Sequence, residues 1–333
     1  MSQIIGLFRD SAAATRAVDQ LVEAHFAPRR EIVVRAANAA GVSEEVPVWV
    51  PLFPAVVALA TVAVSEGQGA LRSLVDAEIA FSRMSVEQGM REAFLGNLAD
   101  DGIVFQPLPV NGKSVWQPRQ RPPATLIWEP EFAEISAAGD LGYTTGPWEL
   151  RPPADADRPT LHGHFHSVWR RTGDAPWKVA VDIGGLHDKL EPGVGSGAFE
   201  AGPVHEPAGK GDRHKAAERE ILEAEKRFSQ ASEKDGFGKA FAAVATEDVR
   251  LSRDGKVPAL GLKTATDGLL GDARAHWTPT GFGASRSGDL AYAYGVRERI
   301  RASAPDTSVF LDVWRREKGK WRLALAVDNA VKR

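Results

Sequence analysis

The chain has no cysteine among its 333 residues. This absence excludes disulfides, thiolate nucleophiles and zinc sites with cysteine ligands, and it leaves the redox compartment undecided. The net charge is only −3, so no global positive field attracts the protein to nucleic acid. The sequence also lacks a nucleophile elbow, a phosphate-binding glycine loop, a dinucleotide fingerprint and an HExxH motif. We therefore expect neither a cofactor nor a metal.

An internal repeat is the main positive feature. The same landmarks recur in the same order in residues 74–182 and 221–328. The matched segments are 76–82 with 223–229, 138–143 with 287–292, 167–171 with 311–316, and 177–182 with 321–328. The offset between the copies stays between 144 and 149 residues over the whole span. A near-constant offset indicates a duplicated domain, and the repeat unit has the length of one small domain.

The repeat divides the chain into five segments. We predict a small βαβ module at 1–40, an apolar connector at 41–70, a first domain at 71–190, a linker at 191–213 and a second domain at 214–333. The linker is rich in proline and glycine, which disfavour regular elements.

The N-terminal module is expected to contain strands at 4–8 and 31–34 around a helix with an apolar face. It opens with a Gly-Leu-Phe-x-Asp strand, and an Ala-rich helix follows. In these features it resembles the general-stress-protein 17M-like module. That resemblance implies an association with stress rather than catalysis.

Residues 46–64 form an uncharged apolar run of 19 positions, just long enough to span a bilayer. Pro47, Pro51 and Pro54 weaken a straight spanning helix in its first half. The uninterrupted part at 55–64 has the length of a signal-peptide apolar region. We weigh a membrane or export segment against a buried linker helix, and we favour the former.

Each repeat is expected to place its helices before its strands. Helices are predicted at 71–82, 86–98, 216–232 and 237–245. Strands are predicted at 102–105, 125–128, 132–135, 141–145, 148–150, 163–170, 177–182, 249–251, 281–285, 291–301, 308–315 and 321–327. This order indicates an α+β fold in which helices pack on one face of an antiparallel sheet.

Three landmarks carry a family resemblance: the leading Ala-Glu-x-x-Phe helix, the Gly-Asp-Leu-x-Tyr strand start, and the final hairpin with its two tryptophans. Together they resemble the SnoaL-like and domain-of-unknown-function-4440 branch of the nuclear-transport-factor-2-like superfamily, which also holds ketosteroid isomerase. The resemblance implies two cone-shaped domains, each a curved sheet wrapped on helices around a pocket. It also implies sheet-to-sheet pairing, here as an intramolecular pseudo-dimer. Because the superfamily hosts several enzyme classes and plain binding domains, the fold does not give the function.

His162, His164 and His166 alternate, so they project from one face of a strand. One of them could act as a general base near neutral pH, or all three could line the sheet without chemistry. A shared metal would require a bend, because same-face residues lie about 6.5–7 Å apart along a strand. The second copy has no histidine there, so the feature belongs to the first repeat.

Asp182 and Asp328 occupy the same position in the last strand of each copy. A carboxyl inside an apolar cone has a raised pKa and can abstract a proton beside a carbonyl, as in ketosteroid isomerase. The alternative is a strand-end aspartate that caps a turn or pairs with an arginine. The candidate catalytic residues are His164, His166 and Asp182.

Aromatic and polar side chains offer a pocket wall. The candidates are Trp128, Tyr143, Trp148, His162, His276 and Trp277. Trp169, Trp177 and their second-copy equivalents recur in both repeats and are predicted to be core.

Three functions stay open from the sequence. The first is a small-ligand-binding or stress-related protein whose cones hold an apolar molecule. The second is an isomerase- or dehydratase-type enzyme that uses a histidine or aspartate of the first repeat. The third is a non-catalytic interaction scaffold. An active pocket is expected in the first repeat, because the residues suited to chemistry lie where the copies differ.

Overall fold

The computed structural model describes residues 34–37, 43–46, 63–153, 155–189, 199–269, 273–300 and 306–331. In the N-terminal part, strands β1 (Val34–Ala37) and β2 (Ser43–Val46) pair antiparallel. The predicted strand at 4–8, the helix after it and most of the apolar run lie outside the described residues. Within the described ranges, no helix is long and apolar enough to cross a membrane. A membrane or export segment at 46–64 stays a prediction.

The first cone runs from α2 to β9. Its helices are α2 (Ala63–Gln88), α3 (Met90–Asn97) and α4 (Gly112–Trp116). Its strands are β3 (Leu98–Phe105), β4 (Pro109–Asn111), β5 (Thr125–Trp128), β6 (Phe132–Ile135), β7 (Leu141–Arg151), β8 (Leu161–Arg170) and β9 (Lys178–His187). Their order is β6-β7-β8-β9-β3-β4, and β5 pairs with the far end of β7.

The second cone runs from α5 to β16 and repeats this plan. Its helices are α5 (His214–Asp235), α6 (Phe237–Val244) and α7 (Leu262–Asp267). Its strands are β11 (Ala245–Arg253), β12 (Lys256–Leu260), β13 (Arg274–Ala284), β14 (Leu290–Ile300), β15 (Asp306–Glu317) and β16 (Lys320–Ala330), in the order β12-β11-β16-β15-β14-β13. The predicted α+β fold with two tandem cones is confirmed. The exact domain limits at 71–190 and 214–333 stay predictions.

Helix α2 is longer than the sequence pattern predicts, because the helical pattern continues into the connector. It buries Leu74, Glu78 and Phe81 on the face that meets the sheet. It ends before Gly89, whose φ of 96° is a conformation that other residues rarely adopt. The break turns the chain into α3, so that the two helices cover one side of the first sheet.

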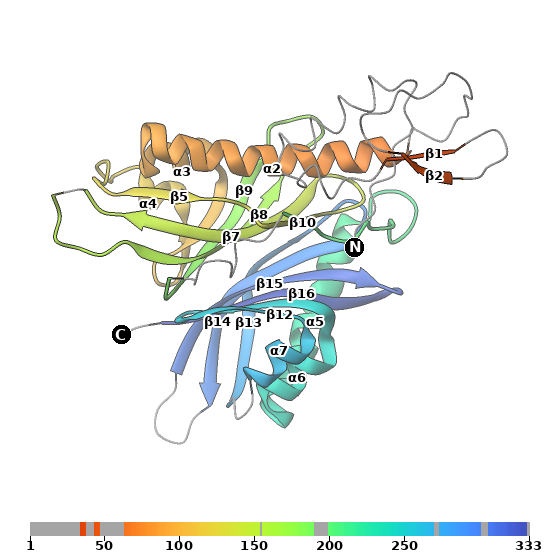
Figure 1. Cartoon of the computed structure of the whole chain (residues 1–333). Helices are drawn as coiled ribbons and strands as arrows, with labels where there is room; N and C mark the ends of the chain where they lie inside the picture. Colours follow the sequence, from red (N-terminus) through yellow and green to blue (C-terminus); the bar gives the residue numbers. More distant parts are fainter. Residues whose placement is uncertain are drawn as a thin grey trace.

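The two sheets pack face to face, with helices α2 and α5 on the outer sides (Figure 1). A shared hydrophobic core lies between them. It includes Tyr143, Val168, Val181 and Ile183 from the first sheet and Tyr292, Leu311, Val313, Leu325 and Val327 from the second. Each sheet therefore has two buried faces, one against its own helices and one against the other sheet. The pseudo-dimer expected from the resemblance is present within one chain.

A pseudo-twofold exchange of hydrogen bonds joins the two Gly-Asp turns. The amide of Ala137 donates to Oδ2 of Asp289 over 2.8 Å, and the amide of Arg286 donates to Oδ2 of Asp140 over 3.0 Å. Arg286 is the second-copy equivalent of Ala137, so each turn uses the same atoms toward the other. Such reciprocity is the signature of an isologous interface.

The linker enters this interface. Its strand β10 (Glu200–Ala201) pairs parallel with β6. Its His205 is buried, with Nε2 at 2.8 Å from the carboxylate of Glu134, which also accepts a hydrogen bond from Tyr143. Arg315 of the second cone lies 3.5 Å from the same carboxylate. The linker thus contributes a side chain to the polar contacts that hold the cones together.

Candidate functional site

Each cone holds one buried glutamate at the middle of its first helix. Glu78 accepts hydrogen bonds from the indole N–H groups of Trp128 (2.6 Å) and Trp169 (2.7 Å) and from the hydroxyl of Thr144 (2.5 Å). Burial raises the pKa of Glu78, and these hydrogen bonds oppose the rise. The carboxyl is fully enclosed, so its role is to tie α2 to strands β5, β7 and β8.

The second cone repeats this arrangement. Glu225 accepts from the indoles of Trp277 (2.7 Å) and Trp314 (2.6 Å). The tryptophans of the second cone are the repeat equivalents of Trp128 and Trp169. A motif of one helical glutamate and two strand tryptophans is therefore common to both copies and belongs to the framework.

The two cones differ in one buried side chain, which is a cation in the second cone. In the second cone, Arg297 lies inside with 1% exposure and donates to Asp312. Its Nη1 is 3.9 Å from Oδ1 of Asp328. Its guanidinium carbon lies 4.2 Å from the ring centre of Phe310 and 4.5 Å from that of Trp277. Buried charges are costly unless they are paired, and this cone supplies its own counter-ion.

Strand pairing places Trp148 at the position of Arg297. Trp148 pairs with Gly163 as Arg297 pairs with Ser308, and Gly163 and Ser308 are equivalent positions of β8 and β15. The indole of Trp148 lies on the sheet over two glycines. A Cβ added at Gly163 would come within 2.5 Å of the ring, and one at Gly184 within 3.3 Å of its Nε1. Glycine at these two positions allows the indole to lie flat.

The predicted match of Asp182 with Asp328 is wrong by two positions. Ser167 pairs with Asp182, whereas its equivalent Asp312 pairs with Ala326, so Asp328 corresponds to Gly184.

Asp182 is a carboxyl of the first cone without a counter-ion among the described residues. It accepts a hydrogen bond from the hydroxyl of Ser167 over 2.9 Å. Burial raises the pKa of Asp182 to about 7, the charge of Glu78 adds to the rise, and the Ser167 hydrogen bond opposes it. No lysine or arginine of the described part of the chain is among the groups that act on it. The exposure of Asp182 as a residue is intermediate.

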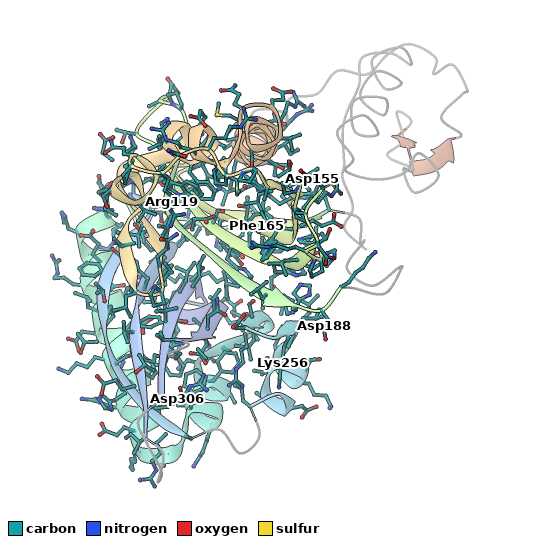
Figure 2. All side chains as sticks on the ribbon, turned by 90° about the vertical axis from the view of Figure 1, so that its left-hand side faces the viewer. Arg119, Asp155, Phe165, Asp188, Lys256 and Asp306 are labelled. Atoms are coloured by element: carbon teal, nitrogen blue, oxygen red, sulfur yellow. The ribbon has the colours of Figure 1, made fainter. Side chains whose placement is uncertain are left out.

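The end of the first cone that lies beyond Phe165, about 13 Å along the strands from Asp182, is apolar. Alternation along β8 and β9 puts Leu161 and Leu186 on the same face as Asp182, and they are 42% and 39% exposed. Leu150 of β7 pairs with Leu161, and Leu126 of β5 pairs with Leu150. The deeper part of the cone is filled by packed rings, including Phe165, which Figure 2 shows inside the first cone. We call Trp148, Ser167, Asp182 and these four leucines the open-end site.

The three histidines share one face, as the alternation predicts, but it is the face opposite to Asp182. His164 and His166 are buried between the cones, and His162 is partly exposed. His166 bonds Thr145 over 2.9 Å. Burial lowers the pKa of His166 well below its usual value, so the ring is neutral at pH 7. The predicted candidates His164 and His166 therefore do not converge with Asp182.

His164 belongs to a short chain of polar groups. The Nδ1 of His187 lies 2.6 Å from the carbonyl oxygen of Asp188, so that nitrogen carries a proton. Its Nε2 then accepts from Nδ1 of His164 over 2.7 Å, and Nε2 of His164 faces Glu131 at 3.1 Å. The nitrogens point in opposite directions, and within the described residues no group of three such side chains could hold a metal.

The remaining predicted wall residues are dispersed. Trp128 and Trp277 are buried and donate to the glutamates, so they are part of the framework. Tyr143 lies between the sheets and donates to Glu134. His276 lies on the outer edge strand, 3.4 Å from Glu298. Of the six predicted wall residues, Trp128 and Trp148 pair with each other and share the cone face of Asp182, and Trp128 is already bonded to Glu78.

Sequence reasoning missed the framework glutamates and the importance of Arg297. Glu78 lies three residues before Phe81 and four after Leu74, on the apolar stripe of its helix. An acidic residue on a buried stripe in both copies is a signal that could have revealed its role. The exchange of Trp148 for Arg297 was visible only after the strand registers aligned the two copies.

No protein-family model and no curated protein matches the chain. Among solved structures, an NTF-2-like protein of unknown function from Shewanella oneidensis matches with 16% identity and a TM-score of 0.30, covering 33% of this chain and 97% of its own. A ketosteroid isomerase-like protein from Erwinia carotovora matches with 18% identity, covers 34% and 95%, and has a TM-score of 0.30. An NTF2-like protein of unknown function from Pseudomonas putida matches with 19% identity, covers 36% and 89%, and has a TM-score of 0.31.

Each match covers about a third of the chain, which is the length of one cone. At these TM-scores the likeness supports no statement about activity. The fold of the two cones rests on their own strand order and helix packing.

Proposed function

We propose that the first cone binds a small, mostly apolar molecule at the open-end site, with Asp182 as its polar anchor. The observation that carries this proposal is the carboxyl of Asp182, a residue of intermediate exposure, whose pKa burial raises to about 7 and on which no cation of the described residues acts. Small-molecule sites commonly combine apolar walls with a few placed polar groups. Here the leucines supply the wall, and Trp148 offers an indole N–H for which the described residues show no acceptor.

The contacts in the second cone support placing the ligand in the first cone. There, the carboxyl of Asp328, two positions further along the last strand, is bonded by Ser308 and Arg299 and lies close to Arg297. A carboxyl with that many partners is fixed by the protein and is not available to a ligand. The two cones thus divide into one that is internally neutralised and one that keeps a free carboxyl.

The test is a thermal-shift screen of small cyclic molecules at pH 6 and pH 8, on the wild type and on Asp182→Asn. Ligands that accept a hydrogen bond should bind the protonated carboxyl and lose affinity above pH 7, and donors should show the reverse. Both effects should vanish in Asp182→Asn and persist in Asp174→Asn, a change at an exposed turn residue. Stabilising ligands that ignore pH and Asp182 would contradict the proposal.

Proton-transfer catalysis of the isomerase or dehydratase type is a second candidate. It is favoured by the same pKa, because a general base works best when its pKa lies near the working pH. The test is deuterium exchange at the carbon beside the carbonyl of small cyclic enones in D₂O. Exchange that exceeds buffer and is lost in Asp182→Asn supports catalysis, and exchange equal in the two proteins excludes it.

A further inference from the structure

The contact between the two sheets has one polar end. The first sheet contributes His164, His166 and His187 there, with exposed fractions of 3%, 1% and 9%. The second cone lies against this end, because the amide of Gly255 donates to the carbonyl of Leu186 over 2.6 Å. We call the three histidines and this hydrogen bond the histidine end of the interface. The Gly-Asp turns lie at the opposite end of β8.

Two of the three rings have a polar partner on each nitrogen. Nε2 of His187 lies 2.7 Å from Nδ1 of His164, and Nδ1 of His187 lies 2.6 Å from the carbonyl oxygen of Asp188. Nε2 of His164 lies 3.1 Å from the carboxylate of Glu131. A positive charge on His164 therefore has an anion beside it.

His166 has no such anion. Its Nδ1 meets the hydroxyl of Thr145 over 2.9 Å, and its Nε2 has no hydrogen-bond partner among the described residues. Its neighbours across the two adjacent strands, Thr145 and Ile183, carry no charge. The titratable and charged groups that act on it are His164, on its own strand, and Arg250 of β11 in the second cone.

The charge of Arg250 is fixed in this contact. Its side chain is buried, bonds Glu200 over 2.5 Å and places its guanidinium carbon 3.9 Å from the ring centre of Phe132. A proton on His166 would add a second positive charge where water is excluded. Burial, His164 and Arg250 accordingly hold the pKa of His166 well below its usual 6.5.

We propose that the histidine end is an acid-sensitive contact, which opens as the pH falls below about 6 while the Gly-Asp turns keep the cones joined at the other end. Opening brings His166 into water, where its ring takes up a proton freely. This inference stands apart from the proposed ligand binding, because the histidines lie on the sheet face opposite to Asp182.

The direction follows from the difference in proton uptake. Since the pKa of His166 is lowered in the closed protein, the open form binds more protons below pH 6.5 and is favoured by acid. A histidine that is protonated only in the open form raises the opening equilibrium about thirtyfold between pH 7.5 and pH 5.

Amide hydrogen exchange of the full chain at pH 7.5 and pH 5, corrected for the intrinsic rates, measures this opening. The amide of Gly255 reports the histidine end, and that of Ala137, bonded to Asp289, reports the turn end. In the wild type, we expect acid to increase opening at Gly255 and to leave Ala137 protected.

His166→Asn tests the assignment, because its amide can still meet Thr145 but does not titrate. The acid-induced increase at Gly255 should be roughly ten- to thirtyfold smaller in this variant, since the other titrating groups cancel in the comparison. His276→Asn is the matched control, a change of an exposed histidine on the outer edge strand, and should behave as the wild type.

An NMR titration of the His166 ring in the wild type gives a test that needs no variant. The ring should stay neutral until exchange at Gly255 increases. A midpoint near 6.5 with Gly255 still protected would overturn the inference. So would equal pH dependence in the wild type and His166→Asn, or loss of protection at Ala137 together with Gly255, which would mean unfolding rather than opening at one end.

Discussion

At the scale of single residues, Asp182 and Asp328 lie in the last strands of the two cones, two positions apart in register, and have different partners. Asp328 is bonded by Arg299 and Ser308, whereas Asp182 has the hydroxyl of Ser167. The difference follows from their neighbours, since arginines lie within 4 Å of Asp328 and none is among the groups that act on Asp182. Asp328 is therefore paired within the protein, and burial raises the pKa of Asp182 to about 7.

The raised pKa of Asp182 gives a stability prediction. The folded state holds the proton up to pH 7, whereas the unfolded chain releases it near pH 4, so this group lowers stability as the pH rises from 4 to 7. Asp182→Asn removes that loss. We expect the variant to match the wild type near pH 4 and to exceed it above pH 7 by roughly 1 kcal/mol, a modest value because the group is partly solvated.

Urea unfolding at pH 4, 6 and 8 measures this difference. Comparing wild type with variant cancels the other titrating groups, including Glu78 and Asp312, whose pKa values burial also raises. A variant less stable than the wild type at pH 8 would contradict the assignment.

The framework glutamates give a second prediction. Trp314→Phe removes one indole donor from buried Glu225 and leaves part of that carboxylate unsatisfied. The expected cost is roughly 2–3 kcal/mol, because an unpaired buried charge loses its compensation. Trp321→Phe is the matched control, since Trp321 donates to the partly exposed Glu220 and its loss should cost about 1 kcal/mol or less. Equal costs in urea unfolding would argue against the buried glutamate as a framework residue.

At the scale of elements, the two Gly-Asp turns connect the cones, and Asp289 is the more buried of their two aspartates. It is fully buried and accepts from Ser285, Ser287 and the amide of Ala137. Asp140, its equivalent, is partly exposed. We expect Asp289→Ala to destabilise by roughly 2–4 kcal/mol and Asp140→Ala by about half as much or less, in thermal or urea unfolding. The reverse order would contradict the exchange of bonds across the interface.

The strands also show how much of the secondary structure the sequence predicts. Strands β5 and β6 agree with the predicted ranges residue for residue, because turn residues bound both. Strand β7 was predicted as two pieces around Gly146 and Pro147, but it is continuous. The carbonyl of Pro147 accepts from the amide of Glu129, which lies between β5 and β6. Proline has no N–H to donate, and this side of Pro147 faces the gap between those two strands, where a regular ladder bond is not required. A local sequence pattern does not contain this contact between strands, so it could not predict that β7 is continuous.

The site was predictable to a similar degree. Alternation predicts that His162, His164 and His166 share a face, but a period of two residues does not say which face meets the helices. The raised pKa expected for an aspartate in an apolar cone holds for Asp182. The absence of a counter-ion could not be predicted, because it depends on which residue of β7 reaches the interior.

At the scale of the whole molecule, the sheet-to-sheet core makes the two cones depend on each other. Leu311 is fully buried in that shared core. We expect Leu311→Asp to expose both cones, because a charge there is unpaired and the first sheet loses its apolar cover. Hydrogen exchange should show lost protection in β8 and β9 as well as in β15. Unchanged exchange in the first cone would mean that the cones are independent.

The ends of β9 and β16 extend this dependence to the site. The amide of Leu186 donates to Asp254, and Asn329 donates to the carbonyl of Gly184. Figure 2 shows Asp188, just after β9, near Lys256 of the second cone. The strand that carries Asp182 is therefore held from behind by the second cone, which acts as a support for the first.

The titration of the Asp182 side chain tests the central claim most directly. Carboxyl ¹³C shifts, assigned with Asp182→Asn, report its protonation in the intact chain. A free carboxyl in an apolar cone predicts a midpoint near pH 7. A midpoint near pH 4 or below would show that the carboxyl is solvated or paired, and it would contradict both the open-end site and the division of roles between the cones.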